Sequence, residues 1–163
     1  MTLSTTYGSE LSEQPDFSTK RFMVVDDMPE MTETVIRMLK RHGASQFFRS
    51  TNVEEALAVA AREKPDCIIS DFNMPAQTGL HFLSAIRTGA KAGLPRDQRF
   101  ILLTGHGEAE VVRTAVALDV NGYVVKPVSL KMLVQTVERA LAKPTPLKAA
   151  TAYQSVKVGA APV

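Results

Sequence analysis

Five polar side chains in this sequence stand at the ends of short apolar runs, and their types are suited to binding metal ions and phosphate. The five residues, which follow four different runs, are Asp26, Asp27, Asp71, Thr104 and Lys126. Three carboxylates that lie close together raise one another's pKa unless a cation is nearby. Mg²⁺ prefers oxygen ligands and is often held by one or two carboxylates together with a phosphate oxygen. The set therefore indicates divalent-cation and phosphoryl chemistry, with Asp71 as the nucleophile of an aspartyl phosphate.

Each of these residues also has a simpler explanation when it is taken alone. An aspartate after a strand is often a turn former or a helix cap. Thr104 belongs to the glycine-rich stretch 104–107, and Lys126 precedes a proline, as a solvated loop lysine could. The functional interpretation depends on their joint placement, because all five residues occupy the same end of different runs.

The apolar runs alternate with segments of helical periodicity. The runs cover 22–25, 46–49, 67–70, 100–103 and 122–125. Four of them are almost uniformly apolar, as strands covered on both faces are, whereas 46–49 is more polar and indicates an edge strand. Between the runs, apolar residues recur at spacings of three and four, which predicts amphipathic helices. Pro29 suits the first turn of the first helix, and Asn52, Thr78 and Ser129 are candidate caps of later ones.

This alternation predicts an α/β fold, namely a doubly wound (βα)5 domain with a five-stranded parallel sheet. The carboxyl ends of all strands in such a sheet point to one edge, where ligands collect. We therefore expect the five polar residues to meet at that edge, although they are far apart in the sequence.

Composition and charge narrow the class of protein further. The chain has 163 residues, of which 45% are hydrophobic and 22% charged, and its net charge of +2 is too small to argue for a nucleic-acid partner. A single cysteine, Cys67, excludes an intramolecular disulfide and fits a reducing compartment. No apolar stretch has the length of a signal peptide or a membrane span, so we expect a cytoplasmic protein. Residues 1–19 and 143–163 read as a disordered arm and a disordered tail around one domain at 20–142.

Residues 20–142 resemble the receiver domain of a two-component response regulator, and most closely the single-domain chemotaxis type. The resemblance rests on four blocks, Val-Val-Asp26-Asp27, Ser-Asp71-Phe-Asn-Met-Pro75, Leu-Leu-Thr104-Gly and Asn-Gly-Tyr123-Val-Val-Lys126-Pro127. It implies the flavodoxin-like strand order 2-1-3-4-5.

The resemblance also implies a role for each residue of the site. Asp71 would accept a phosphoryl group from a phosphohistidine. Mg²⁺, for which Mn²⁺ could substitute, would be bound by Asp27, Asp71 and the backbone carbonyl of Asn73, and by Asp26 through a water molecule.

The remaining implied roles concern the phosphoryl group after it has arrived. Lys126 and Thr104 would stabilise it, and Lys126–Pro127 would be a cis peptide. Thr104 and Tyr123 would form a switch pair, while Asn73 and His106 would tune the lifetime of the phosphoryl group.

The function expected from this resemblance is that of a stand-alone signalling protein rather than an enzyme. A histidine kinase or a histidine phosphotransfer protein would act upstream, and phosphorylation would shift the face formed by 106–142. With no further domain expected after 142, the signal would leave by protein contact. The target could be a flagellar motor switch, a phosphotransfer protein or another kinase. No membrane is expected to take part, and the protein would be a monomer or a phosphorylation-dependent dimer.

Two other functions and one segment remain open from the sequence. A magnesium-dependent phosphatase of the haloacid-dehalogenase type also uses an aspartyl nucleophile, but it carries a second aspartate where this chain has Asn73. A phosphorylation-independent interaction domain would not need the complete set of acids, threonine and lysine. The stretch 89–98 is longer than usual for its place and is either a docking loop or a tolerated insertion.

Overall fold

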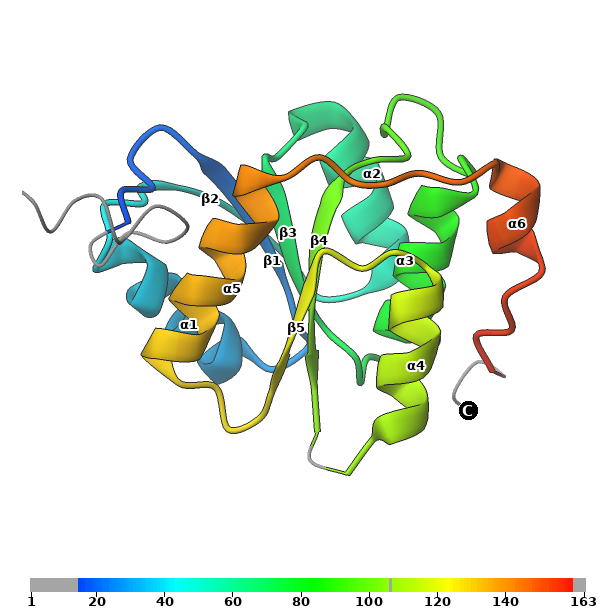
Figure 1. The fold of residues 1–163 in the computed structure, drawn as a ribbon. Helices are drawn as coiled ribbons and strands as arrows, with labels where there is room; N and C mark the ends of the chain where they lie inside the picture. Colours follow the sequence, from blue (N-terminus) through cyan, green and yellow to red (C-terminus); the bar gives the residue numbers. More distant parts are fainter. Residues whose placement is uncertain (1–14, 106, 160–163) are drawn as a thin grey trace, which may run out of the picture.

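Five parallel strands and six helices make up the fold in the computed structural model, which describes residues 15–105 and 107–159 (Figure 1). The strands are β1 (Arg21–Val25), β2 (Gln46–Ser50), β3 (Cys67–Asp71), β4 (Arg99–Thr104) and β5 (Gly122–Val125). The helices are α1 (Pro29–Lys40), α2 (Val53–Glu63), α3 (Gly79–Arg87), α4 (Ala109–Ala117), α5 (Leu130–Ala142) and α6 (Ala150–Gln154). The strand order β2-β1-β3-β4-β5 and the expected doubly wound sheet are confirmed.

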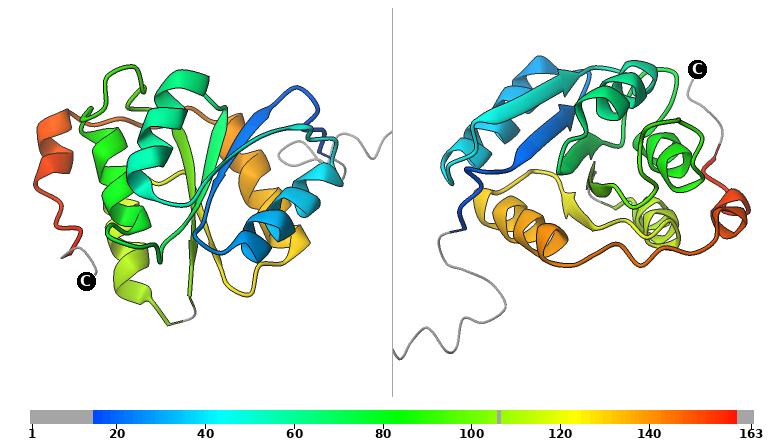
Figure 2. Two further views of the ribbon diagram at one scale, coloured as in Figure 1. Left: turned by 180° about the vertical axis from the view of Figure 1, so that it is seen from behind. Right: turned by 90° about the horizontal axis from the view of Figure 1, so that it is seen from above.

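The sheet has an apolar core on each face, because successive residues of a strand point to opposite sides. On β1, Phe22 and Val24 pack with α1 and α5, whereas Met23 and Val25 pack with α2, α3 and α4. Figures 1 and 2 show these two helical layers on either side of the strands. The sheet is therefore covered by helices on both faces, and the carboxyl ends of its parallel strands form one edge.

Local sequence signals fix where the helices begin. Pro29 is the first residue of α1, where its missing N–H leaves no hydrogen bond unmade. The side chains of Asn52, Thr78 and Ser129 each accept a hydrogen bond from the backbone N–H three residues on, as predicted for caps. The cap at Thr78 starts α3 close to the end of β3, which holds the loop 72–78 beside the sheet edge.

The prediction of a disordered tail over 143–163 is wrong for residues 143–159. These residues pack along the domain and include α6, whose Tyr153 is fully buried and donates a hydrogen bond from its hydroxyl to Asp119 Oδ2 at 2.7 Å. The prediction rested on the overall composition of the segment, which does not reveal the packing of a single aromatic residue. Residues 160–163 lie outside the described residues.

The predicted disordered arm, 1–19, also needs correction where the structure describes it. Phe17 is buried against the ring of Phe22, with centroids 5.5 Å apart, and its N–H donates to His42 O at 2.7 Å. Residues 15–19 are therefore part of the packed domain, while 1–14 lie outside the described residues. Within the described ranges, no helix is long and apolar enough to cross a membrane.

Candidate functional site

The three aspartates predicted to converge lie together at the carboxyl edge of the sheet. Asp26 and Asp27 follow β1, and Asp71 is the last residue of the neighbouring strand β3. One carboxylate oxygen from each lies within 4.8 Å of the other two. Asp26 and Asp71 are buried and Asp27 is exposed, so the cluster opens to solvent on one side.

The charges of the two buried aspartates are poorly compensated. Burial raises the pKa of Asp26 to about 6, although a hydrogen bond from Met28 N, at 2.9 Å, works in the opposite direction. The pKa of Asp71 is also raised, chiefly by burial and against the attraction of Lys126. Asp26 Oδ2 is buried and has no hydrogen-bond partner. Groups in this condition favour a bound cation, and hard carboxylate oxygens suit Mg²⁺.

Within the part of the chain that the structure describes, Lys126 supplies the one positive charge in direct contact with Asp71. It follows β5, and its Nζ lies 2.6 Å from Asp71 Oδ1. Its backbone N–H donates to Thr104 O at 2.8 Å, which fixes the lysine beside the end of β4. The peptide bond between Lys126 and Pro127 is cis, as the resemblance implied.

Thr104 and Tyr123 lie on the adjacent strands β4 and β5 but differ in their surroundings. Thr104 is fully buried at the end of β4, and its hydroxyl has no hydrogen-bond partner. Tyr123 is 42% exposed. The tyrosine ring therefore faces outward in this structure, while a buried hydroxyl without a partner stands one strand away.

A cavity of about 540 Å³ opens over the acid cluster. Its lining comes from the ends of β1, β3 and β5 and from the loop before α3, and comprises Asp27, Met28, Asp71, Phe72, Asn73, Met74, Thr78 and Lys126. Asn73 thus lines the same cavity as Asp71. His106, predicted to tune the phosphoryl lifetime, lies outside the described residues.

Sequence reasoning did not pick out Met28 as part of this cavity. Its side chain is 56% exposed although it is large and apolar. The available signal was its position directly after Asp26 and Asp27, where the chain leaves the strand at the ligand-binding edge.

The fold and the site together define a class of protein: a doubly wound α/β domain with an acid cluster and a lysine at the carboxyl edge of its sheet. Residues 22–138 match the family model of the response regulator receiver domain. The chain belongs to this family, and its function therefore lies in two-component signalling.

Known relatives are similar over most of the chain. A chemotaxis protein CheY homolog of Campylobacter jejuni is 30% identical over 122 residues, which are 74% of this chain and 92% of that protein. A probable chemotaxis protein CheY of Rhizobium etli is 27% identical over 118 residues, which are 72% of this chain and 89% of that protein. The solved structure of the chemotaxis response regulator CheY4 of Vibrio cholerae matches with a TM-score of 0.64 at 30% identity, and covers 75% of this chain and 98% of that one.

Proposed function

We propose that Asp71 accepts a phosphoryl group from the phosphohistidine of a histidine kinase or a histidine phosphotransfer protein. The observation that carries this proposal is the setting of Asp71. Its buried carboxylate lies 2.6 Å from an ammonium group, has two further carboxylates within 4.8 Å, and lines an open cavity of about 540 Å³. That cavity gives a phosphoryl donor access to the carboxylate of Asp71.

The residues present fit a magnesium ion. Asp27 and Asp71, together with the backbone carbonyl of Asn73, would hold Mg²⁺ (or Mn²⁺ in its place), and Asp26 would contact the ion through water. The buried Asp26 Oδ2 without a partner and the raised pKa of Asp26 support this assignment. Mg²⁺ bound here would offset the negative charge of the aspartates and of the incoming phosphoryl oxygens.

In the transfer itself, a carboxylate oxygen of Asp71 forms a bond to phosphorus while the bond from phosphorus to the donor imidazole nitrogen breaks. The electron pair of the broken bond stays on the imidazole, which then takes up a proton. Lys126 is placed to follow the charge from the carboxylate to the phosphoryl oxygens, because its Nζ already contacts Asp71. Thr104 would donate its unpartnered hydroxyl to a phosphoryl oxygen. Asn73 and His106 would control how readily water attacks the product.

The signal would arise as a shift between two arrangements of the face formed by 106–142. Thr104 would move toward the phosphoryl group, and the exposed Tyr123 would turn inward into the space that it leaves. The altered face would then bind a protein target in the cytoplasm. By analogy with the chemotaxis relatives, candidate targets are a motor switch, a phosphotransfer protein or a kinase, reached by a monomer or a phosphorylation-dependent dimer.

A turnover experiment separates this proposal from an aspartyl phosphatase. The purified chain is incubated with Mg²⁺ and an excess of p-nitrophenyl phosphate, and nitrophenol release is compared with the amount of protein. A phosphoacceptor is expected to release at most about one equivalent of nitrophenol per protein molecule. Any further release should be no faster than the self-dephosphorylation of Asp71. Rapid multiple turnovers that Asp71→Asn abolishes would instead assign a phosphatase.

A further inference from the structure

The segment that follows α5, residues 143–159, crosses the domain and packs against helices on its other side. In Figure 1 it runs from the end of α5 to α6, which lies next to α3. Figure 2 shows the same path from behind and from above. We call residues 143–159 the C-terminal clasp. It lies beyond the residues matched by the family model, 22–138.

The first anchor of the clasp is at the start of β5. Thr145 is buried, and its hydroxyl donates to Asp97 O at 2.8 Å and accepts from Asn121 Nδ2 at 2.9 Å. Asn121 Oδ1 in turn accepts from Phe100 N, at 2.8 Å, on β4. The clasp is therefore joined to Asn121, the residue directly before β5.

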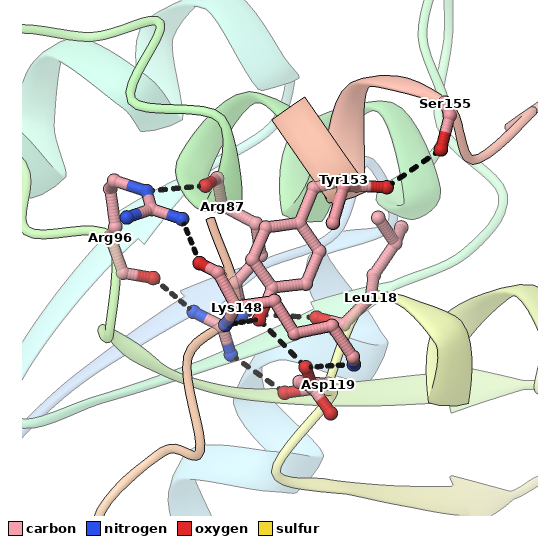
Figure 3. A network of polar contacts seen from close by, with 8 residues as sticks. Arg87, Arg96, Leu118, Asp119, Lys148, Tyr153 and Ser155 are labelled. Atoms are coloured by element: carbon pink, nitrogen blue, oxygen red, sulfur yellow. Dashed lines mark hydrogen bonds and ion pairs between the residues drawn. The ribbon is translucent and has the colours of Figure 1, made fainter. Parts of the chain in front are cut away.

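The second anchor is at Asp119, in the turn between α4 and β5. Asp119 Oδ2 accepts from the hydroxyl of Tyr153 at 2.7 Å and from Lys148 Nζ at 2.6 Å (Figure 3). The Tyr153 hydroxyl also accepts from Lys148 N at 2.9 Å, which locks the two clasp residues together. Asp119 has a φ of +52°, a conformation that few residues other than glycine adopt without support. The clasp supplies part of that support.

Arg87, the last residue of α3, holds the same turn from the inner side. Its guanidinium is fully buried and donates to Leu118 O at 3.0 Å and to Asp119 O at 2.9 Å. It also donates to Arg96 O, while Arg96 donates to Lys148 O on the clasp, both at 2.6 Å (Figure 3). The turn that ends α4 is thus fixed between a buried arginine and the clasp.

The other end of α4 is tied less closely to the domain: the side chain of Glu108 accepts one hydrogen bond, from Gly105 N at 2.9 Å, and among the described residues no buried charged side chain binds this end. Ala115 is the one buried residue in this helix, and its N-cap residue Glu108 makes no capping hydrogen bond with its side chain. A groove of about 470 Å³ lies at this end of the helix. It is lined by Gly105, Gly107, Glu108, Ala109, Val112, Arg113, Tyr123 and Val125. The helix therefore has open space at its N-terminal end and a network of polar contacts at its C-terminal end.

We propose that the C-terminal clasp fixes the C-terminal end of α4 and the start of β5, so that α4 changes position only at its N-terminal end, above the groove beside Tyr123. The clasp makes the turn 118–121 the pivot of the helix. A displacement that begins at the carboxyl edge of the sheet then swings the N-terminal end of α4 instead of moving the whole helix.

Amide hydrogen exchange on the full chain, resolved by NMR and measured without any phosphoryl donor, tests this proposal. The amides of 118–121 are all hydrogen-bonded, and three of their acceptors are carbonyls of α4. In the wild type we expect protection to rise along α4 from Val112 toward Leu118. In the double variant Tyr153→Phe/Lys148→Met, which keeps the buried ring, exchange at 118–121 is expected to be roughly tenfold faster.

A matched control is Lys157→Met, which removes the charge of an exposed clasp residue for which the described part of the chain shows no ion pair. It is expected to leave exchange at 118–121 unchanged. Asp119→Asn, which keeps a residue tolerant of positive φ but loses the charge that pairs with Lys148, should also speed exchange at 118–121, by a smaller factor, and it provides the test if the double variant folds poorly. Equal protection along 112–121 in the wild type, or wild-type exchange at 118–121 in both anchor variants, would overturn the proposal.

Discussion

Lys126 Nζ lies 2.6 Å from Oδ1 of Asp71, and the two side chains reach this contact from different surroundings. The aspartate side chain is 4% exposed, whereas that of the lysine is 26% exposed. One ammonium group thus approaches the buried carboxylate from the open side of a site that holds three carboxylates. The ion pair offsets only part of the negative charge, and the remainder is the physical reason to expect a divalent cation.

Replacing Asp27 with alanine should weaken Mg²⁺ binding without unfolding the protein. Asp27 is exposed, so its loss leaves no buried gap, but it removes one of the proposed oxygen ligands. We expect Mg²⁺ affinity to fall roughly tenfold or more, by analogy with the cost of weakening metal sites. Calorimetric titration suits the measurement, because the chain has no tryptophan to report binding.

The control for this variant is Asp97→Ala, an exposed acid that precedes β4 and therefore lies at the opposite edge of the sheet. It should bind Mg²⁺ like the wild type. Equal Mg²⁺ affinity in the Asp27→Ala variant and the wild type would show that Asp27 is not a ligand.

The pH dependence of the metal-free protein should reveal the burial of Asp26. Its pKa of about 6 in the folded state exceeds the ordinary value of 3.8, so folding favours the protonated form. The associated stability is present below about pH 4 and is lost as the pH rises through about 6. Thermal unfolding without metal should therefore show a falling Tm over this range, and Asp26→Asn should flatten the profile.

Binding of Mg²⁺ should have the opposite pH dependence, because the cation binds the ionised carboxylate and competes with the proton. The affinity of the protein for Mg²⁺ should rise with pH up to about 6 and then level off. A metal-free Tm that falls between about pH 4 and about pH 6 as steeply in Asp26→Asn as in the wild type would contradict the assignment.

Replacing Thr104 with valine should not destabilise the unphosphorylated protein. The Thr104 hydroxyl is buried without a hydrogen-bond partner, so an apolar group of the same shape removes an unsatisfied polar atom. The free energy of unfolding in urea should stay the same or rise by up to about 1 kcal/mol.

Thr136→Val provides the comparison on a helix. The Thr136 hydroxyl donates to Met132 O at 2.7 Å, so this variant loses a hydrogen bond and should be the less stable of the two. A Thr104→Val variant that loses more stability than Thr136→Val would mean that the Thr104 hydroxyl has a partner in solution.

The sheet and the convergence of the acids were predictable because both follow from local patterns. Uniformly apolar runs specify buried parallel strands, and the geometry of such a sheet brings Asp26, Asp27 and Asp71 to one edge regardless of their separation in sequence. The lysine at the end of β5 follows by the same rule. These inferences needed only the end of each run and not the details of side-chain packing.

The clasp was not predictable in this way, because it depends on single long-range contacts. Tyr153 pairs with Asp119, 34 residues away, inside a segment whose overall composition resembles a linker. Sequence reasoning did not single out Arg87 at the end of α3, yet this side chain is fully buried and donates hydrogen bonds to backbone carbonyls. Nor did the sequence indicate that Phe17 packs against Phe22. Single long-range contacts of this kind leave no periodic pattern in the sequence from which they could be predicted.

Intact-mass spectrometry of the chain after incubation with Mg²⁺ and acetyl phosphate tests the central claim most directly. The wild type should gain the mass of one phosphoryl group, and fragmentation after mild quenching should place it on Asp71. The Asp71→Asn variant, in which the amide is a poor nucleophile, should gain nothing. Equal labelling of Asp71→Asn, or no adduct on folded, Mg²⁺-loaded wild type under donor excess, would contradict the account.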